Sequence, residues 1–215
     1  METVLKVGGS LLNYPDKLKK LCTEISRLSR DFKLLVIPGG GSFADLVRRY
    51  YVKYRLSEDT SHWMAILAMD TYGFLLSELI KNSQVVFTIE GIYKAWKNGG
   101  LPILLPFRIL FEEDPLIHSW SVTSDSISAY IARKIKAKRL ILLKDVDGIY
   151  NDNNELIGKI GLKQLSEMNT CIDRYFPKVL EGFKIECYVV NGLYPDRVKK
   201  LILGLETIAT KITMD

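Results

Sequence analysis

Short apolar runs alternate with amphipathic segments along the chain. Runs rich in valine, isoleucine and leucine are typical of buried strands, and they occur at residues 4–7, 34–37, 85–87, 103–105, 140–143, 188–190 and 210–213. Apolar residues at helical spacing, such as Leu18, Leu21 and Ile25, predict helices, which we expect over 18–28, 43–54, 62–80, 124–137, 173–181 and 196–203. Because strands and helices alternate, the pattern predicts an α/β fold, a three-layer αβα sandwich around a mostly parallel central sheet.

The acidic stretch 112–115, which ends in a proline, interrupts this pattern near the middle of the chain. A chain of 215 residues suits one large domain or two closely joined lobes. We therefore expect a single domain over residues 1–215, with lobes of about 1–115 and 116–215 that share one sheet. Residues 151–154, Asn-Asp-Asn-Asn, predict the tip of a hairpin in the second lobe.

The charge pattern favours a small anionic ligand. The chain has a formal net charge of +5 and a sequence pI of about 9.0. Its lysines and arginines are spread over many segments and interleaved with acids, as on a solvated surface. Nucleic acid requires positive charge gathered in one patch, so we expect no nucleic-acid partner.

Cysteine usage and hydropathy indicate a cytoplasmic protein. The three cysteines lie far apart, which fits neither a disulfide framework nor a zinc cluster and indicates a reducing compartment. The N-terminus lacks the apolar stretch of a signal peptide, and no run reaches the ~18 apolar residues of a membrane span. We expect no membrane partner.

Glycine-rich turns follow the first two predicted strands. The first strand carries Lys6 and ends in the turn 8–10, and the second ends in the glycine triplet 39–41. A turn between strand and helix aims free N–H groups outward, where they bind phosphate, and glycine lets the backbone approach a ligand. A plain turn is the alternative for 8–10, whereas a plain turn seldom needs three consecutive glycines. Both turns would face one crevice at the carboxyl edge of the sheet.

Two polar clusters follow in the second lobe. Thr123, Ser124 and Asp125 precede an amphipathic helix, where helix capping is an equal explanation for them. The strand at 140–143 runs into the polar segment 144–150, which suits a nucleotide ribose, although a simple Asp-Gly turn explains it as well.

Several familiar enzyme classes have no motif in the chain. The sequence contains neither the Gly-x-x-x-x-Gly-Lys-Ser/Thr phosphate loop nor the Gly-x-Gly-x-x-Gly dinucleotide fingerprint. It also lacks the Gly-x-Ser-x-Gly nucleophile elbow of serine hydrolases. The histidines, His62 and His118, do not have the spacing of metal ligands, so we expect no metal held by protein side chains alone.

In this order and spacing, the four segments resemble the amino acid kinase family. The resemblance extends from Lys6 to about Ile212, nearly the whole chain. It implies an ATP-dependent phosphotransferase whose N-terminal half holds a small anionic acceptor and whose C-terminal half holds ATP, with Mg²⁺ on the nucleotide phosphates. It also implies a homo-oligomer.

The resemblance further implies three groups of site residues. The catalytic group is Lys6, Asp125 and Lys178, in which Asp125 holds both lysines, although Arg174, Tyr175 and Phe176 stand where the family usually has glycines. The nucleotide contacts are Gly8, Gly9, Ser10, Lys144, Asp145, Asp147 and Tyr150. The acceptor contacts are Gly39, Gly40, Gly41, Arg48, His62, Asp70, Ser119 and Thr123.

One branch of the family looks most similar, the phosphate kinases of archaeal methanofuran biosynthesis. The resemblance lies in residues 62–70, His-Trp-Met-Ala-Ile-Leu-Ala-Met-Asp, and in residues 118–126. It implies that the acceptor is [5-(aminomethyl)furan-3-yl]methyl phosphate, a phosphate monoester with an ammonium group, which becomes a diphosphate. Isopentenyl phosphate, a nucleoside monophosphate or an amino acid carboxylate are alternative acceptors. A nucleotide-binding storage or regulatory protein is the alternative from another class.

Most of the implied acceptor contacts have a structural alternative. Arg48 suits a phosphate clamp, but an arginine on a helix is usually solvated. Asp70 lies in an apolar stretch and needs a partner, either a substrate ammonium or an internal group. Trp63 and Trp120 suit either a furan sandwich or the core, and His62 suits either the acceptor phosphate or a structural hydrogen bond.

Overall fold

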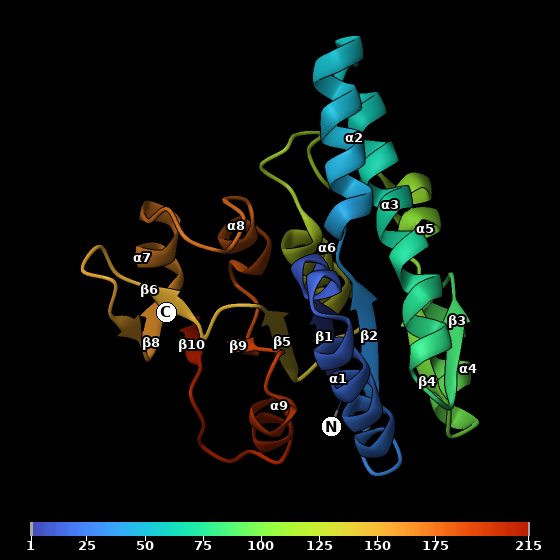
Figure 1. Cartoon of the computed structure of the whole chain (residues 1–215), viewed down its shortest axis with the longest axis vertical. Coiled ribbons are helices and arrows are strands. Elements are labelled where there is room, and N and C mark those ends of the chain that lie inside the picture. The colour runs from blue at the N-terminus through green and yellow to red at the C-terminus, as the bar shows by residue number, and fades with distance from the viewer. Residues whose placement is uncertain (1, 215) are drawn as a thin grey trace.

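An eight-stranded sheet forms the centre of the molecule (Figure 1). The computed structural model describes residues 2–214. The sheet comprises β1 (Thr3–Val7), β2 (Leu34–Pro38), β3 (Ser83–Val86), β4 (Leu101–Leu104), β5 (Arg139–Lys144), β8 (Lys159–Gly161), β9 (Glu186–Asn191) and β10 (Thr210–Thr213). Their order is β3-β4-β2-β1-β5-β9-β10-β8, and every neighbouring pair is parallel except β9 with β10. The predicted, mostly parallel sheet is confirmed.

Helices cover both faces of this sheet, which confirms the predicted three-layer sandwich. They are α1 (Pro15–Leu28), α2 (Gly41–Tyr54), α3 (Glu58–Leu79), α4 (Ile89–Lys97), α5 (Phe107–Glu113), α6 (Ser124–Lys134), α7 (Leu162–Glu167), α8 (Phe176–Leu180), α9 (Pro195–Ile202) and the 3₁₀ turn η1 (Gly9–Asn13). One buried cluster packs α1, α3 and α9 on one face, through Leu21, Tyr72 and Val198. A second cluster packs α4 to α8 on the other face, through Ile92, Ile131 and Phe176 among others.

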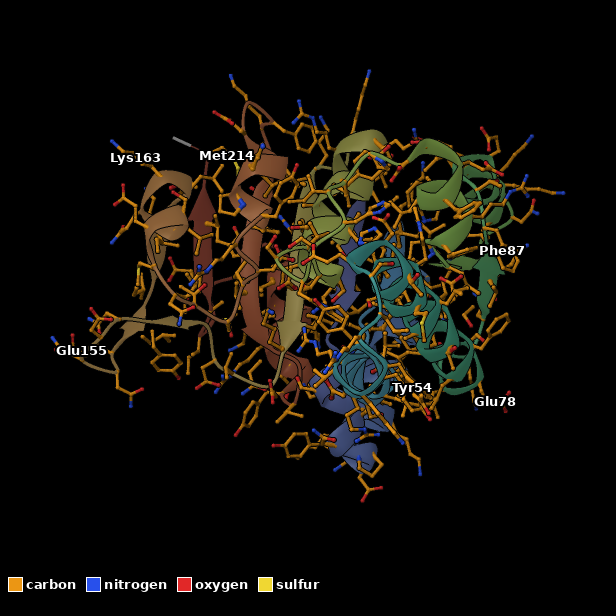
Figure 2. All side chains as sticks on the ribbon, turned by 90° about the horizontal axis from the view of Figure 1, so that it is seen from above. Tyr54, Glu78, Phe87, Glu155, Lys163 and Met214 are labelled. Carbon is orange, nitrogen blue, oxygen red and sulfur yellow. The ribbon has the colours of Figure 1, made fainter. Side chains whose placement is uncertain are left out.

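The predicted hairpin forms a small separate sheet. Strands β6 (Ile149–Tyr150) and β7 (Leu156–Ile157) pair antiparallel, so residues 151–154 form its tip as expected. Asn151 closes the tip, because its Oδ1 accepts from the backbone N–H groups of Asn153 and Glu155. Seen from above, Glu155 marks one side of the molecule and Phe87 lies near the opposite side (Figure 2).

Some helix boundaries differ from the prediction for identifiable reasons. The helix predicted at 62–80 begins at Glu58, because Ser57 caps it by accepting from the N–H of Thr60. The helix predicted at 173–181 is only α8, because Asp173 precedes it and accepts from the N–H of Phe176. The helix predicted at 124–137 ends at Lys134. The sequence pattern does not predict helices α4, α5 and α7 or strand β8.

Two helices extend the molecule beyond the sheet. Helix α2 starts at the glycine triplet after β2, and together with the first half of α3 it rises above the carboxyl edge of the sheet (Figure 1). These two helices form a wall beside that edge. Within residues 2–214, none of the helices combines the length and the apolarity that crossing a membrane requires.

The two glycine turns touch each other at the carboxyl edge. The N–H of Gly39 donates to the carbonyl of Val7 at 2.8 Å, and the N–H of Gly8 donates to the carbonyl of Leu143 at 2.8 Å. A Cβ atom on Gly9 would lie 2.0 Å from the backbone nitrogen of Gly41. Only a residue without a side chain fits at this contact.

We expect Gly9→Ala to destabilise the protein by about 1–3 kcal/mol, the usual cost of overpacking, because the added methyl must separate the two turns. Gly158→Ala is the matched control, since a Cβ atom there has no heavy-atom neighbour within 4 Å. Urea denaturation of both variants measures the difference. Equal free energies of unfolding for the two variants would contradict the packed contact.

Candidate active site

A cavity of about 440 Å³ opens where β1, β2 and β5 end. Its walls come from the glycine turns, from α2 and α3, from the segment leading into α6, and from residues 144–146 after β5. This is the edge of an open α/β sheet at which ligands bind, and the volume suits a small molecule. Both lobes therefore contribute to one site.

One buried carboxylate joins two lysines at the base of this cavity. Asp125 is the second residue of α6, and its side chain is 3% exposed. Its Oδ1 lies 3.0 Å from Nζ of Lys6, and its Oδ2 lies 2.8 Å from Nζ of Lys144. Lys144 also donates to the carbonyl of Cys171 at 2.5 Å. Because β1 and β5 are parallel neighbours in the sheet, their carboxyl ends bring these two lysines together.

The electrostatics of this group favour an anionic ligand. Burial disfavours the carboxylate of Asp125, but attraction to Lys144 and Lys6 outweighs burial and lowers the pKa of Asp125 to about 2. Burial lowers the pKa of Lys6 despite the attraction of Asp125. Burial also acts against the charge of Lys144, but Asp125 and other neighbours outweigh it and raise the pKa of Lys144. Two ammonium groups share one carboxylate, so these three side chains together carry a net positive charge.

The structure places Lys178 elsewhere and corrects the predicted pairing. Lys178 lies on α8 with Nζ 5.3 Å from the ring centroid of Tyr175. It lines a different cavity, together with Pro177 and Gly182. The second lysine on Asp125 is Lys144, which the sequence had assigned to the nucleotide. The end of β5 lies next to the end of β1, whereas α8 packs on one face of the sheet.

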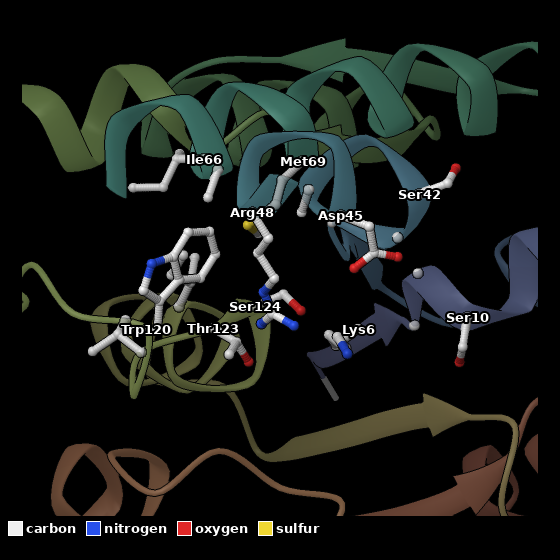
Figure 3. Close-up of a pocket in the computed structure, with 18 of the residues that line it drawn as sticks. Lys6, Ser10, Ser42, Asp45, Arg48, Ile66, Met69, Trp120, Thr123 and Ser124 are labelled. Atoms are coloured by element: carbon white, nitrogen blue, oxygen red, sulfur yellow. The ribbon is translucent and has the colours of Figure 1, made fainter. Parts of the chain in front are cut away.

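Backbone groups of both glycine turns face the cavity. Gly8, Gly9 and Ser10 line it from the end of β1, and Gly40 and Gly41 line it from the start of α2. The first N–H groups of a helix have no partner within the helix and carry partial positive charge. They favour phosphate at this position, beside the Lys6 side chain (Figure 3).

Arg48 and Trp120 lie side by side in the wall of the cavity. Arg48 reaches from α2 toward Lys6 and Thr123, with Trp120 beside it (Figure 3). The guanidinium carbon lies 4.9 Å from the ring centroid of Trp120, which holds the cation near an aromatic face. Ser119 and Thr123 also line the cavity. The structure thus brings the predicted Arg48, Ser119 and Thr123 together.

The two histidines stack on each other at the edge of the cavity. Their ring centroids lie 4.3 Å apart, and His62 lines the cavity. Both ring nitrogens of His118 are engaged, Nδ1 with Asp59 at 2.7 Å and Nε2 with Asp114 at 2.8 Å. Burial, followed by His118, lowers the pKa of His62 to about 4, so His62 is neutral at neutral pH. His62 can therefore offer one N–H to a ligand, whereas His118 links α3, through Asp59, to the end of α5, through Asp114.

The carboxylates that line this part of the cavity differ from the one that the sequence indicated. Asp70 accepts from the N–H of Phe107 at 3.3 Å at the start of α5, and burial raises the pKa of Asp70 to about 7. The partner of Asp70 is thus an internal group of the protein, which is the alternative to a substrate ammonium. Asp45 and Glu58 line the cavity instead, and neither carboxylate has an ion-pair partner within the part of the chain that the structure describes. In the sequence both look like ordinary solvated acids on helices, so no sequence pattern indicates that they line a site.

The predicted nucleotide contacts fall into two groups. Lys144 and Asp145 line the cavity. Asp147 accepts from Asn191 at 2.8 Å and from Arg197 at 2.6 Å, which ties the turn after β5 to β9 and α9. Tyr150 lies on the hairpin and is 37% exposed. The structure therefore does not gather all the predicted nucleotide contacts at one point.

Asp173 is a partly buried carboxylate that the sequence pattern does not mark as a site residue. Its Oδ2 accepts from the backbone N–H of Thr123 at 2.9 Å and from the Thr123 hydroxyl at 2.8 Å. An acid three residues before Phe176 fits a helix cap, which is the signal that was available.

Comparisons with known proteins agree with the fold and with the segments that form the site. The amino acid kinase family matches residues 1–191. The [5-(aminomethyl)furan-3-yl]methyl phosphate kinase of Methanocaldococcus jannaschii is 36% identical over 213 residues, covering 97% of this chain and 96% of that protein. The isopentenyl phosphate kinase of the same organism is 23% identical, covering 95% of this chain and 96% of that protein.

A solved structure gives the same result for the fold. Uridylate kinase from Archaeoglobus fulgidus superposes with a TM-score of 0.79 at 24% identity, over 99% of this chain and 100% of that one. At such low identity the likeness concerns the fold alone. The family match and the 36% identical relative each span most of the chain and confirm the resemblance found in the sequence. The chain belongs to the amino acid kinase family.

Proposed function

We propose that this protein is an ATP-dependent kinase that transfers the γ-phosphoryl group to [5-(aminomethyl)furan-3-yl]methyl phosphate and forms a diphosphate. The observation that carries the proposal is the group of Lys6, Asp125 and Lys144 at the base of a cavity lined by two glycine turns. The acceptor rests on the 36% identity to the M. jannaschii kinase of that name, over nearly the whole chain.

The proposed chemistry follows from charge. Phosphoryl transfer has a loose in-line transition state, and a protein accelerates it by alignment and by stabilising charge. A phosphate monoester is already anionic, so the acceptor needs no strong general base. The obstacle is repulsion between two phosphates, which Lys6 and Lys144 would offset while Asp125 keeps them in place. The glycine-turn N–H groups would bind the oxygens of the transferred group.

The nucleotide would lie on the side of the second lobe. We propose contacts from Gly8, Gly9 and Ser10 to its phosphates, with Lys144, Asp145, Asp147 and Tyr150 along the rest of the nucleotide. Mg²⁺ would arrive on the ATP phosphates and supply further charge neutralisation. Lys178 remains proposed as a cation near the nucleotide, but not as a partner of Asp125.

The acceptor would lie on the side of the first lobe, against the glycine triplet and α2 and α3. Arg48 would bind its phosphate, with Ser119, Thr123 and His62 nearby. Trp120 lines the cavity and would contact the furan ring, whereas Trp63 packs against Phe107 and Phe111. The unpaired carboxylates of Asp45 and Glu58 supply the negative charge that an ammonium group requires.

We also propose that the protein is a cytoplasmic homo-oligomer. Helix α3 exposes large apolar side chains, with Leu67 at 45% and Phe74 at 55% exposed. Exposed apolar side chains on one helix favour contact with another protein surface, here a second copy. Light scattering of the purified protein gives its mass directly.

An acceptor panel tests the proposed function. ADP formation would be measured with the aminomethylfuran phosphate, isopentenyl phosphate, UMP and acetylglutamate, each with ATP and Mg²⁺. We expect the highest kcat/KM for the aminomethylfuran phosphate. A higher value for another acceptor would change the substrate and keep the class. ATP binding without ADP formation on any acceptor would support the regulatory alternative.

Removing the charge of Lys6 is expected to lower kcat by at least ~10²-fold, the scale for losing one electrostatic donor. Lys6→Met keeps a side chain of similar length, so the variant isolates the charge. Lys94→Met is the control, because Lys94 is exposed on α4. Turnover by Lys6→Met equal to that of the control would remove Lys6 from the catalytic group.

The corrected pairing predicts that Lys144→Met and Lys178→Met differ. Because Lys144 contacts Asp125, its loss should lower kcat by ~10²-fold, as for Lys6. Because Lys178 lies in another cavity, its loss should mainly raise the KM for ATP. Steady-state kinetics of both variants give the comparison. Near-normal kcat for Lys144→Met, together with lost turnover for Lys178→Met, would restore the pairing predicted from the sequence.

A further inference from the structure

The Asp173 carboxylate accepts hydrogen bonds from the first turns of two helices, α6 and α8. It lies in the segment between α7 and α8, and it is partly buried. Its Oδ2 accepts from Thr123, as described, and from the N–H of Ser126 at 2.9 Å. Its Oδ1 accepts from the hydroxyl of Ser126 and from the N–H of Phe176 at 2.9 Å. One carboxylate thus receives five donors from two segments.

The contacts of Asp173 hold the chain on both sides of Asp125. Asp125 lies between Thr123 and Ser126, and both of these are held by Asp173. The Thr123 hydroxyl also accepts from the N–H of Asp125 at 3.3 Å. The first turn of α6 has backbone N–H groups without partners in the helix, and Asp173 satisfies one of them from outside. Asp173 therefore holds the backbone on both sides of Asp125.

The segment that carries Asp173 also contacts Lys144, the second lysine bound to Asp125. The carbonyl of Cys171 accepts from Nζ of Lys144, and the N–H of Tyr175 donates to the carbonyl of Ser121 at 3.3 Å. The Phe176 side chain is fully buried in the core and anchors the segment. Residues 171–176 therefore contact Lys144 directly and Asp125 through the start of α6.

We infer that Asp173 is a positioning residue for phosphoryl transfer, acting through Asp125 on the two ammonium groups. The inference rests on the proposed function. A carboxylate is required, because backbone N–H groups, which can only donate, face both of its oxygens: Thr123 and Ser126 at Oδ2, and Phe176 at Oδ1. An asparagine amide keeps one acceptor oxygen, so its NH₂ group would face one of these sets of N–H groups and lose its bonds. Small displacements of aligned groups lower the rate of group transfer steeply.

The variant Asp173→Asn is expected to lower kcat by ~10- to 100-fold, with the KM values for ATP and acceptor little changed. The glycine turns and Arg48, which have no contact with Asp173, stay in place, whereas the alignment of Lys6 and Lys144 does not. Ser126→Ala removes one of the donors and should have a smaller effect in the same direction, which keeps the test open if Asp173→Asn does not fold. Normal kcat for both variants would overturn the inference.

A double-mutant cycle separates positioning from general stability. If Asp173 acts through Asp125, then Asp173→Asn in an Asp125→Asn background should lower kcat no further. Additive losses would show an independent, structural effect and overturn the inference. Glu113→Gln is the control, because Glu113 also holds α6, through Tyr130 and through Lys134 at 2.8 Å, but toward its other end. Its kcat should equal that of the wild type.

Crystal structures give a readout that does not depend on kinase activity. In Asp173→Asn, Asp125 should have moved from at least one lysine, whereas in Glu113→Gln both ion pairs should persist. Unchanged ion pairs in Asp173→Asn would contradict positioning. If the wild type forms no ADP with any acceptor, the proposed function fails, and these structures still decide the role of Asp173.

Discussion

One carboxylate between two ammonium groups is the constraint on which this site depends. Asp125 is buried, and an unpaired buried charge is costly, so it must be matched by Lys6 and Lys144. The same ion pairs hold both lysine side chains in place, and they favour the charged form of each ammonium group, which burial disfavours. The pair of lysines exceeds the single carboxylate in charge, and this excess lies beside backbone N–H groups that also favour phosphate. The contacts that stabilise the buried carboxylate are therefore the same contacts that place positive charge where an anion is favoured.

The order of strands explains why residues far apart in the chain meet here. Strand β1 lies between β2 and β5, so its lysine and turn lie beside the glycine triplet on one side and Lys144 on the other. Helix α6 then supplies Asp125 from one face of the sheet. The segment 171–176 closes the arrangement from the second lobe, since it contacts both Lys144 and the start of α6.

Sequence patterns predicted what depends on local chemistry. Apolar runs predicted every strand of the main sheet except the short β8, and the glycine turns, Lys6 and Asp125 meet at one edge as expected. The partner of Asp125 depends on which strands are neighbours, which periodicity does not encode, so Lys178 was chosen where Lys144 stands. Asp45, Glu58 and Asp173 look like ordinary surface or capping acids in the sequence, and only the fold places them at the site.

A crystal structure with a non-hydrolysable ATP analogue, Mg²⁺ and the aminomethylfuran phosphate would show directly whether the two lysines hold the transferred phosphate. We expect Nζ of Lys6 and Nζ of Lys144 both to lie within hydrogen-bond distance of the γ-phosphate or its bridging group, with Asp125 still between them. Phosphates bound away from these two lysines, for example in the cavity beside Lys178, would contradict it.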